Sequence, residues 1–243
     1  MCVVAAIHGD ELNGVKVAQE TATRYEPGDL AGTLVVVHVA NVPAFQAQQR
    51  YIPIYDQDLN RAFPGRSGSN TAGRIANELW EAFLSWCDYG LDLHASTRNR
   101  TTMFHLRTDM SDPGVERLTR AFGANVVLAA PGDEGSLRGA ATAAGTPTVT
   151  VEMGKAHRFQ PVLVEKAVEG VLAECGLVPG DPPETKRFRV VHDGTDDRAW
   201  LRADTGGLVD EETGEEIERE IRTGEFDGYR ANGTVWRAGE EQE

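Results

Sequence analysis

The chain has 243 residues, enough for one large domain or for a large domain with a small companion. It carries 38 acidic against 24 basic residues, a net charge of −14, which makes a polyanion such as nucleic acid an unfavourable partner. No apolar run approaches the roughly 18 residues of a membrane span, and no secretory leader is recognisable, so we expect no membrane insertion.

Two further features of the composition bear on the environment of the protein. Only four of the basic residues are lysines. An acidic, lysine-poor surface is typical of a halophilic protein that works in high salt, although a high-GC genome produces the same bias. The three cysteines, Cys2, Cys87 and Cys175, are odd in number and far apart in the sequence. We therefore expect reduced thiols and a cytoplasmic location.

The first half of the chain alternates between strand and helix patterns. Residues 3–7 are an apolar run that predicts a buried strand, and residues 11–24 predict a helix. Residues 33–40 are β-branched and apolar, which predicts a strand buried on both faces, as in parallel sheets. Residues 50–70 predict a long irregular loop, a kind of segment that usually has a function. Residues 71–87 predict a helix whose apolar face carries Ile75, Leu79, Ala82, Phe83 and Trp86.

The alternation continues through the next hundred residues and indicates an α/β fold, with a mostly parallel, mixed sheet flanked by helices. Beyond about residue 184 only short strand patterns remain. We therefore expect one domain over residues 1–178 and a small C-terminal all-β domain with an acidic tail over residues 184–243. Strands are predicted at 91–94, 102–106, 125–129 and 146–152, helices at 113–122, 136–144 and 161–175, and short strands of the second domain at 187–192, 199–202 and 233–237.

A histidine and a glutamate, His8 and Glu11, stand where the first strand ends and the first helix begins. Open α/β sheets place their ligand sites at the carboxyl ends of strands. A spacing of three in the first turn of a helix directs both side chains to one side. An imidazole and a carboxylate so placed supply two ligands of a zinc site, which in catalytic centres keeps a position open for water. The alternative is that His8 and Glu11 are surface residues without a metal, with the negative charge of Glu11 favoured by the dipole at the start of the helix.

Other polar residues fall at the same predicted edge of the sheet. His94 closes the strand at 91–94, Glu152 closes the strand at 146–152, and Asn60 and Arg61 lie in the long loop. Taken alone, His94 would be a core histidine and Glu152 a helix-capping acid. Their common edge favours a single site instead.

Five short motifs contain these polar residues or lie in the long loop with them. In chain order they are His8-Gly9-Asp10-Glu11, Arg50-Tyr51, Asp58-Leu59-Asn60-Arg61 followed by Phe63-Pro64-Gly65, Asp92-Leu93-His94, and Val151-Glu152 with Gly154. Together they resemble the succinylglutamate desuccinylase/aspartoacylase family, relatives of the zinc carboxypeptidases. The resemblance runs from residue 2 to about residue 175, and the motifs are specific as a set rather than singly.

The resemblance implies a zinc carboxypeptidase-like fold and one zinc ion per chain, with His8, Glu11 and His94 as metal ligands. It implies Glu152 as the base that activates water and Arg50 as the group that stabilises the oxyanion. Two departures from the family pattern concern these residues. The chain has only seven residues ahead of His8, which predicts either a start upstream of Met1 or a sheet without one edge. A few additional residues separate Arg50 from the next motif, which puts its role in question.

The resemblance also implies that Asn60 and Arg61 bind a carboxylate of the substrate. Arg98, four residues after the strand-ending histidine, adds another cation near the mouth and favours the desuccinylase branch. We therefore expect a zinc-dependent amidohydrolase that removes a succinyl or acetyl type of group from a small anionic N-acyl amino acid. The alternatives are a metallocarboxypeptidase that acts on peptides and a metal-binding pseudoenzyme. The oligomeric state stays open, a homo-oligomer included.

Overall fold

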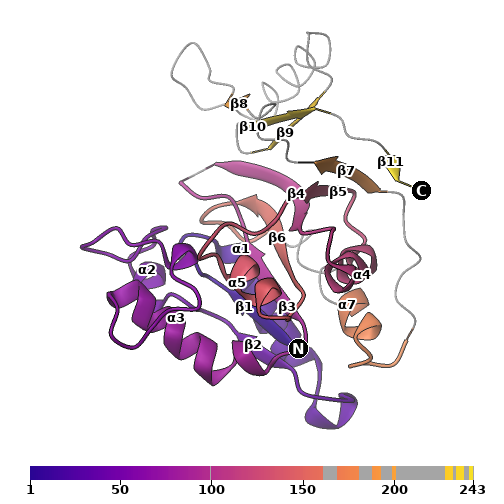
Figure 1. The fold of residues 1–243 in the computed structure, drawn as a ribbon, viewed down its shortest axis with the longest axis horizontal. Coiled ribbons are helices and arrows are strands. Elements are labelled where there is room, and N and C mark those ends of the chain that lie inside the picture. The colour runs from indigo at the N-terminus through magenta and orange to yellow at the C-terminus, as the bar shows by residue number, and fades with distance from the viewer. Residues whose placement is uncertain are drawn as a thin grey trace.

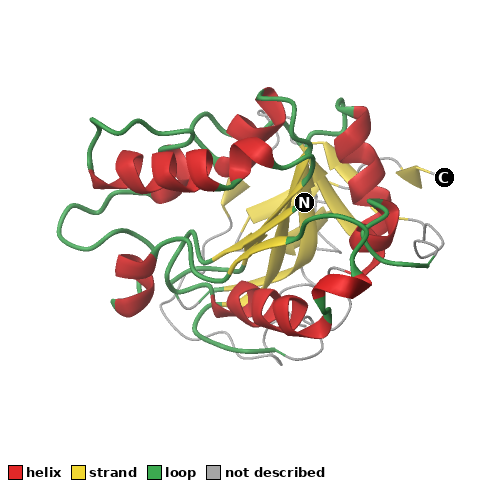
Figure 2. Ribbon diagram, turned by 90° about the horizontal axis from the view of Figure 1, so that it is seen from below, coloured by secondary structure: helices red, strands yellow, loops and turns green. Residues whose placement is uncertain are grey.

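A computed structural model of the protein describes residues 1–98, 100–160, 169–180, 188–192, 199–200, 228–231, 234–237 and 241–242. It shows one layer of strands with helices packed against both faces (Figures 1 and 2). Among these residues, no helix combines the length and the apolar character needed to cross a bilayer.

The central sheet is mixed and mostly parallel, as the sequence predicted. Its strand order in the described residues is β11-β7-β5-β4-β6-β3-β1-β2. All neighbouring pairs are parallel except β4 with β6 and β7 with β11. The strands are β1 Cys2–Ala5, β2 Val35–Val37, β3 Gly90–His94, β4 Thr101–Thr108, β5 Val126–Ala129, β6 Thr148–Lys155, β7 Phe188–His192 and β11 Glu241–Gln242.

Helix α4 has recognisable capping chemistry at both of its ends. At the start of α4, the carboxylate of Asp112 accepts hydrogen bonds from two backbone N–H groups of the first turn, and Gly123 ends the helix in the left-handed conformation with φ 70°. The helices are α1 Leu12–Arg24, α2 Val42–Gln46, α3 Thr71–Ala82, α4 Pro113–Phe122, α5 Leu137–Ala143 and α7 Glu169–Glu174, with 3₁₀ turns at Pro27–Asp29, Leu59–Arg61 and Leu84–Trp86.

Two apolar clusters occupy the two faces of the sheet. Successive residues of a strand point to opposite faces, so Val3 of β1 belongs to the cluster beneath α1, α4 and α7, and Val4 belongs to the cluster beneath α3 and α5. In β3, Leu91 and Leu93 join the first cluster. The residues between and after them, Asp92 and His94, are buried as well but point to the opposite face. That face, on the side of α5, therefore carries polar groups within the fold.

The strand predicted at 33–40 and the helix predicted at 71–87 are both shorter in the structure. The strand predicted at 33–40 is shortened to β2, whose residues are half-buried rather than buried on both faces, because β2 is the last strand at its edge. The helix predicted at 71–87 ends at Ala82, since the backbone of Phe83 leaves helical angles (φ −136°, ψ −56°). Trp86 therefore leaves the predicted apolar face and is 80 % exposed.

The prediction of reduced thiols was wrong for two of the three cysteines. Cys2 and Cys87 form a disulfide with a Cα–Cα distance of 5.9 Å, although 85 residues separate them in the sequence. The pairing of β1 with β3 brings them together, because Cys2 lies opposite Gly90 in the register. Cys175 has a free thiol, and burial raises its pKa to about 11. The cytoplasmic location loses this support and stays a prediction.

Part of the predicted C-terminal domain is described. β7 adds to the central sheet beside β5. The short strands β8 Ala199–Trp200, β9 Gly228–Ala231 and β10 Thr234–Arg237 form a second, three-stranded sheet. Most of the predicted acidic tail and the first half of the helix predicted at 161–175 lie outside the described residues. The division at residues 178 and 184 stays a prediction.

Candidate metal centre

The turn between β1 and α1 carries the first two predicted metal ligands. The chain leaves β1 at Ala6, which has a left-handed φ of 52°, and returns to helix at Leu12 with Glu11 as the N-cap residue. Gly9 is packed against the backbone of α2, so closely that a Cβ atom would lie 2.0 Å from the carbonyl carbon of Ala44. Only glycine fits there, and this contact fixes the turn that presents His8 and Glu11.

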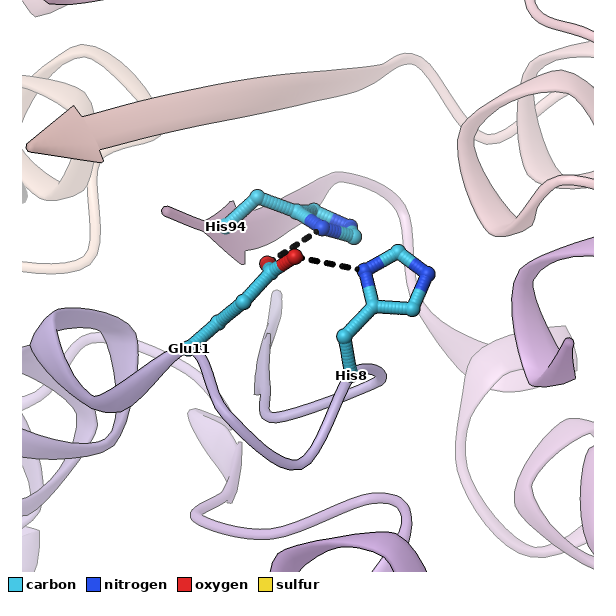
Figure 3. A group of neighbouring side chains, drawn as sticks. All are labelled: His8, Glu11 and His94. Carbon is cyan, nitrogen blue, oxygen red and sulfur yellow. Dashed lines mark hydrogen bonds and ion pairs between the residues drawn. The ribbon is translucent and has the colours of Figure 1, made fainter. Parts of the chain in front are cut away.

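His8, Glu11 and His94 converge on one point, with the glutamate between the two imidazole rings (Figure 3). Glu11 Oε1 lies 2.8 Å from Nδ1 of His8, and Glu11 Oε2 lies 2.8 Å from Nδ1 of His94. The backbone N–H of Ala95 also donates to Glu11 Oε2 at 3.0 Å. All three side chains are buried, and one ligand atom from each lies within 4.8 Å of the others.

The outer nitrogen of each imidazole faces a carboxylate that was not singled out from the sequence. Nε2 of His8 lies 3.1 Å from Asp58 Oδ1, and Nε2 of His94 lies 2.9 Å from Asp92 Oδ1. Such carboxylates orient metal-binding histidines and fix which nitrogen carries the proton. Asp92 could have been found, because it precedes His94 by two residues on one strand and so lies on the same face.

The charges of this cluster favour a bound cation. Burial disfavours the charged forms, yet Glu11 and Asp58 together raise the pKa of His8, and Asp92 with Glu11 raises the pKa of His94 well above its usual range. The same contacts lower the pKa of Glu11 against the effect of burial. The carboxylate of Glu11 is thus kept ionised between the two imidazoles. The donor set of two histidines and a glutamate, with oriented rings, fits a zinc ion.

Arg50 lies at the rim of the centre. Its Nη1 is 3.3 Å from Nδ1 of His8 and 3.6 Å from Glu11 Oε1. Its Nη2 donates to Asp58 Oδ2 at 3.2 Å. The guanidinium also lies over the ring of Tyr51, 5.6 Å from the ring centroid. These contacts hold one fixed positive charge beside the three predicted ligands.

The centre opens into a pocket of about 330 Å³ whose wall is rich in arginine. Glu152 also lines it, at a position in the middle of β6 rather than at the end of a strand, because β6 continues to Lys155. Glu152 is paired with His94 across the parallel register of β6 and β3. The basic residues of the wall are Arg50, Arg61, Arg100, Arg107 and Arg138, and the acidic ones are Glu11, Asp133 and Glu152.

The predicted substrate-binding residues differ in where they lie. Asn60 and Arg61 line the pocket. The side-chain oxygen of Asn60 accepts from the backbone N–H of Leu137 at 2.8 Å, and Arg61 donates to Asp133 at 2.7 Å. Arg98 is not among the residues that line this pocket in the described chain; its guanidinium lies 5.4 Å from the ring centroid of Tyr51.

Comparison with known proteins identifies the family. The family model of the succinylglutamate desuccinylase/aspartoacylase catalytic domain matches residues 1–175. The chain belongs to this family. The resemblance found in the sequence motifs is thereby confirmed.

Other members of the succinylglutamate desuccinylase/aspartoacylase family are distant relatives of this chain. This chain is 24 % identical over 213 residues to the N-alpha-acetyl-L-2,4-diaminobutyric acid deacetylase of Halomonas elongata, and the alignment covers 84 % of this chain and 62 % of the relative. It is 30 % identical over 107 residues to a probable aspartoacylase of Parasynechococcus marenigrum, covering 39 % of this chain and 33 % of that protein. The chain thus spans less than two thirds of the length of these curated relatives.

Solved structures share the fold. The succinylglutamate desuccinylase/aspartoacylase of Rhodobacter sphaeroides superposes with a TM-score of 0.74 at 23 % identity, over 85 % of this chain and 66 % of that one. The product-bound ectoine utilization protein EutE (DoeB) of Ruegeria pomeroyi gives a TM-score of 0.74 at 23 % identity, over 85 % of this chain and 68 % of that one. The fold prediction is thereby confirmed for the central sheet and its helices.

Proposed function

We propose that this chain is a zinc-dependent amidohydrolase that removes an acyl group of succinyl or acetyl type from an N-acyl amino acid. The observation that carries the proposal is the buried group of His8, Glu11 and His94 at the floor of an arginine-lined pocket. The relatives of this chain support the reaction class, since the two proteins named above are a deacetylase and a probable aspartoacylase.

His8, Glu11 and His94 would hold one zinc ion, with Asp58 and Asp92 orienting the two imidazole rings. When bound, the ion supplies a Lewis acid that polarises the amide carbonyl and lowers the pKa of water. Zinc is the cation that this donor set suits best, because two neutral imidazole nitrogens and one carboxylate are among its usual catalytic ligands.

The other steps fall to side chains of the chain itself. Glu152 would accept a proton from the attacking water and return it to the leaving amine, the role of a general base that then acts as an acid. Glu152 is paired with His94 in the backbone register of β6 and β3, and it lines the same pocket. Arg50, fixed by Asp58 at the rim of the centre, would stabilise the negative oxygen that develops on the carbonyl.

Recognition of the substrate would rest on Arg61 and Arg100 among the arginines of the pocket. A guanidinium binds a carboxylate through two parallel hydrogen bonds, and Arg61 with Asn60 lines the wall in a position to do so. Arg61 is bonded to Asp133, so a substrate carboxylate would share or displace that contact. Arg100, which lines the pocket, is a better candidate for an additional cation than Arg98, which does not. A volume of about 330 Å³ suits a small anionic substrate.

The test is a panel of N-acetyl, N-succinyl and N-formyl amino acids, each incubated with zinc-loaded protein at low and at high salt, with release of free amine as the measured quantity. We expect release from at least one acyl amino acid with a free α-carboxylate and much less from its carboxamide. Release of C-terminal amino acids from peptides would instead support the carboxypeptidase alternative. Zinc binding with no release from any compound would support the pseudoenzyme alternative.

A further inference from the structure

Arg107 lies on the polar face of the sheet beside Glu152, and the motifs gave no reason to single it out. β4 and β6 are antiparallel, with a register irregularity between Thr102 and His105 that sets His105 opposite Glu152 and Arg107 opposite Thr150. Directly opposed residues of an antiparallel pair face the same side of the sheet, and long side chains reach the diagonal neighbour as well. The irregularity therefore brings Arg107 to the pocket and within reach of Glu152.

The contact between the two side chains is an ion pair, and no hydrogen bond of normal length forms between them. Arg107 Nε lies 3.7 Å from Glu152 Oε1, and the two side chains are 31 % and 13 % exposed. The same Nε is buried and, within the described part of the chain, has no hydrogen-bond partner. A buried donor without a partner is costly, so this N–H group is available to the carboxylate or to a water between them.

Another positive charge, that of Arg138, lies near Arg107 in the wall of the same pocket. Arg138 of α5 donates to the backbone carbonyls of Ala130 and Pro131, at 2.8 and 3.3 Å, which fixes its guanidinium. Burial lowers the pKa of Arg138, and the nearby charge of Arg107 lowers it further. Repulsion between the two guanidinium groups opposes a movement of Arg107 toward Arg138.

From this geometry we propose that Arg107 is a positioning residue that holds the carboxylate of Glu152 in the orientation its catalytic role requires. The inference rests on the proposed function only in taking Glu152 as the base. A glutamate side chain has several rotatable bonds and loses conformational freedom when it is held. A general base must lie within hydrogen-bond reach of the proton it takes, so a fixed neighbouring cation that limits its rotamers raises turnover without contacting the substrate.

The test compares two substitutions of Arg107 with a matched control. Arg107→Gln removes the charge, and Arg107→Lys keeps it. Arg120→Gln is the control, because Arg120 is also 31 % exposed and also forms an ion pair with a glutamate, but on α4. With the zinc-loaded enzyme and the best substrate of the panel, Arg107→Gln should lower kcat by about ten- to a hundredfold, less than loss of the base itself. KM and zinc content should stay near wild type, Arg107→Lys should recover part of the rate, and Arg120→Gln should have no effect.

A double-mutant cycle with Glu152→Gln separates positioning from other roles. If Arg107 acts through Glu152, Arg107→Gln should lower the residual rate of the Glu152→Gln enzyme by less than about twofold. The proposal would be overturned if Arg107→Gln lowered the rate of the Glu152→Gln enzyme by the same factor as it lowers the rate of the wild type. It would also be overturned if Arg107→Gln raised KM and left kcat unchanged, because that pattern marks a substrate-binding residue.

Failure of the proposed function has a different signature, namely that the wild-type enzyme releases no amine from any acyl amino acid. In that case, the free energies of unfolding of the wild type, the two single variants and the double variant test whether Arg107 and Glu152 interact. A coupling energy between the two substitutions supports the proposed contact of Arg107 with Glu152, and strictly additive effects overturn it.

Discussion

At the scale of single residues, each histidine of the candidate metal centre has two different sides. Nδ1 of His8 and of His94 faces Glu11, and Nε2 of each faces an aspartate. An imidazole that gives its N–H to a carboxylate keeps its other nitrogen free to bind a metal. Nε2 of His8 has this contact with Asp58, whereas Nε2 of His94 lies 2.9 Å from Asp92 without hydrogen-bond geometry. Asp58 therefore orients the ring of His8, and the charge of Asp92 lies beside the ring of His94.

This arrangement predicts a loss of zinc affinity when one aspartate loses its charge. Asp92→Asn keeps the size of the side chain but weakens the hold on His94, so zinc affinity should fall about ten- to a hundredfold. Competition with a chromophoric chelator measures it. The control is Asp109→Asn, because the carboxylate of Asp109 accepts a hydrogen bond from the exposed Ser111 and not from a histidine of the metal centre. Equal affinities of the two variants would remove Asp92 from the metal centre.

How far these residues can be predicted from sequence depends on whether their partners are close in the chain. His8, Glu11 and His94 are recognisable because each ends or follows an apolar strand. Arg107 is not recognisable, because its place beside Glu152 depends on the register irregularity between β4 and β6. Arg98 and Arg100 are two residues apart, and only the path of the loop after β3 decides which one lines the pocket.

At the scale of elements, the local patterns predicted α4 over Pro113–Phe122 and the strand that ends in His94. These succeed because caps and apolar periodicity are contained within the element. The reversed direction of β4 against β6, the edge position of β2 and the Cys2–Cys87 disulfide depend on which strands become neighbours. No short-range pattern carries that information.

The contact between α1 and β3 gives a prediction at this scale. Gly14 of α1 lies against β3, where a Cβ atom would be 2.8 Å from the carbonyl oxygen of Leu93. Helix propensity alone favours alanine over glycine by about 1 kcal/mol, but this contact should reverse the sign. Gly14→Ala should therefore melt at a lower temperature than wild type and bind zinc more weakly, since α1 and β3 carry Glu11 and His94.

The matched control is Gly28→Ala, because a Cβ atom at Gly28 would meet nothing within 4 Å. It should melt within a degree or two of wild type, as most exposed substitutions cost little. A melting temperature of Gly14→Ala at or above that of wild type would show that α1 shifts without cost and would contradict the tight packing of α1 on β3.

At the scale of the whole molecule, a net charge of −14 contrasts with a pocket lined by more arginines than acids. The overall field would repel an anionic substrate of the kind proposed at long range, and the arginines of the pocket would attract it at short range. Salt screens the long-range term first, because the Debye length falls to about 3 Å at 1 M.

Repulsion among the acidic residues should also limit stability in dilute buffer. The melting temperature should therefore rise between low and molar KCl, because screening relieves the repulsion. Differential scanning calorimetry in a KCl series measures this, with a neutral osmolyte at equal osmolality as the control. A melting temperature that stays constant or falls as KCl is raised would contradict the halophilic interpretation, and the protein would then be acidic without being adapted to salt.

We propose that His8, Glu11 and His94 hold the metal while Glu152 serves only as the base. The variant Glu152→Gln keeps the size of the side chain but cannot accept the proton, so its zinc content and its turnover should be measured together. We expect the same zinc content as wild type and a rate about 10²–10⁴-fold lower. A loss of zinc together with activity would show that Glu152 is a metal ligand, and full activity would show that another group is the base; either result would contradict the assignment of Glu152.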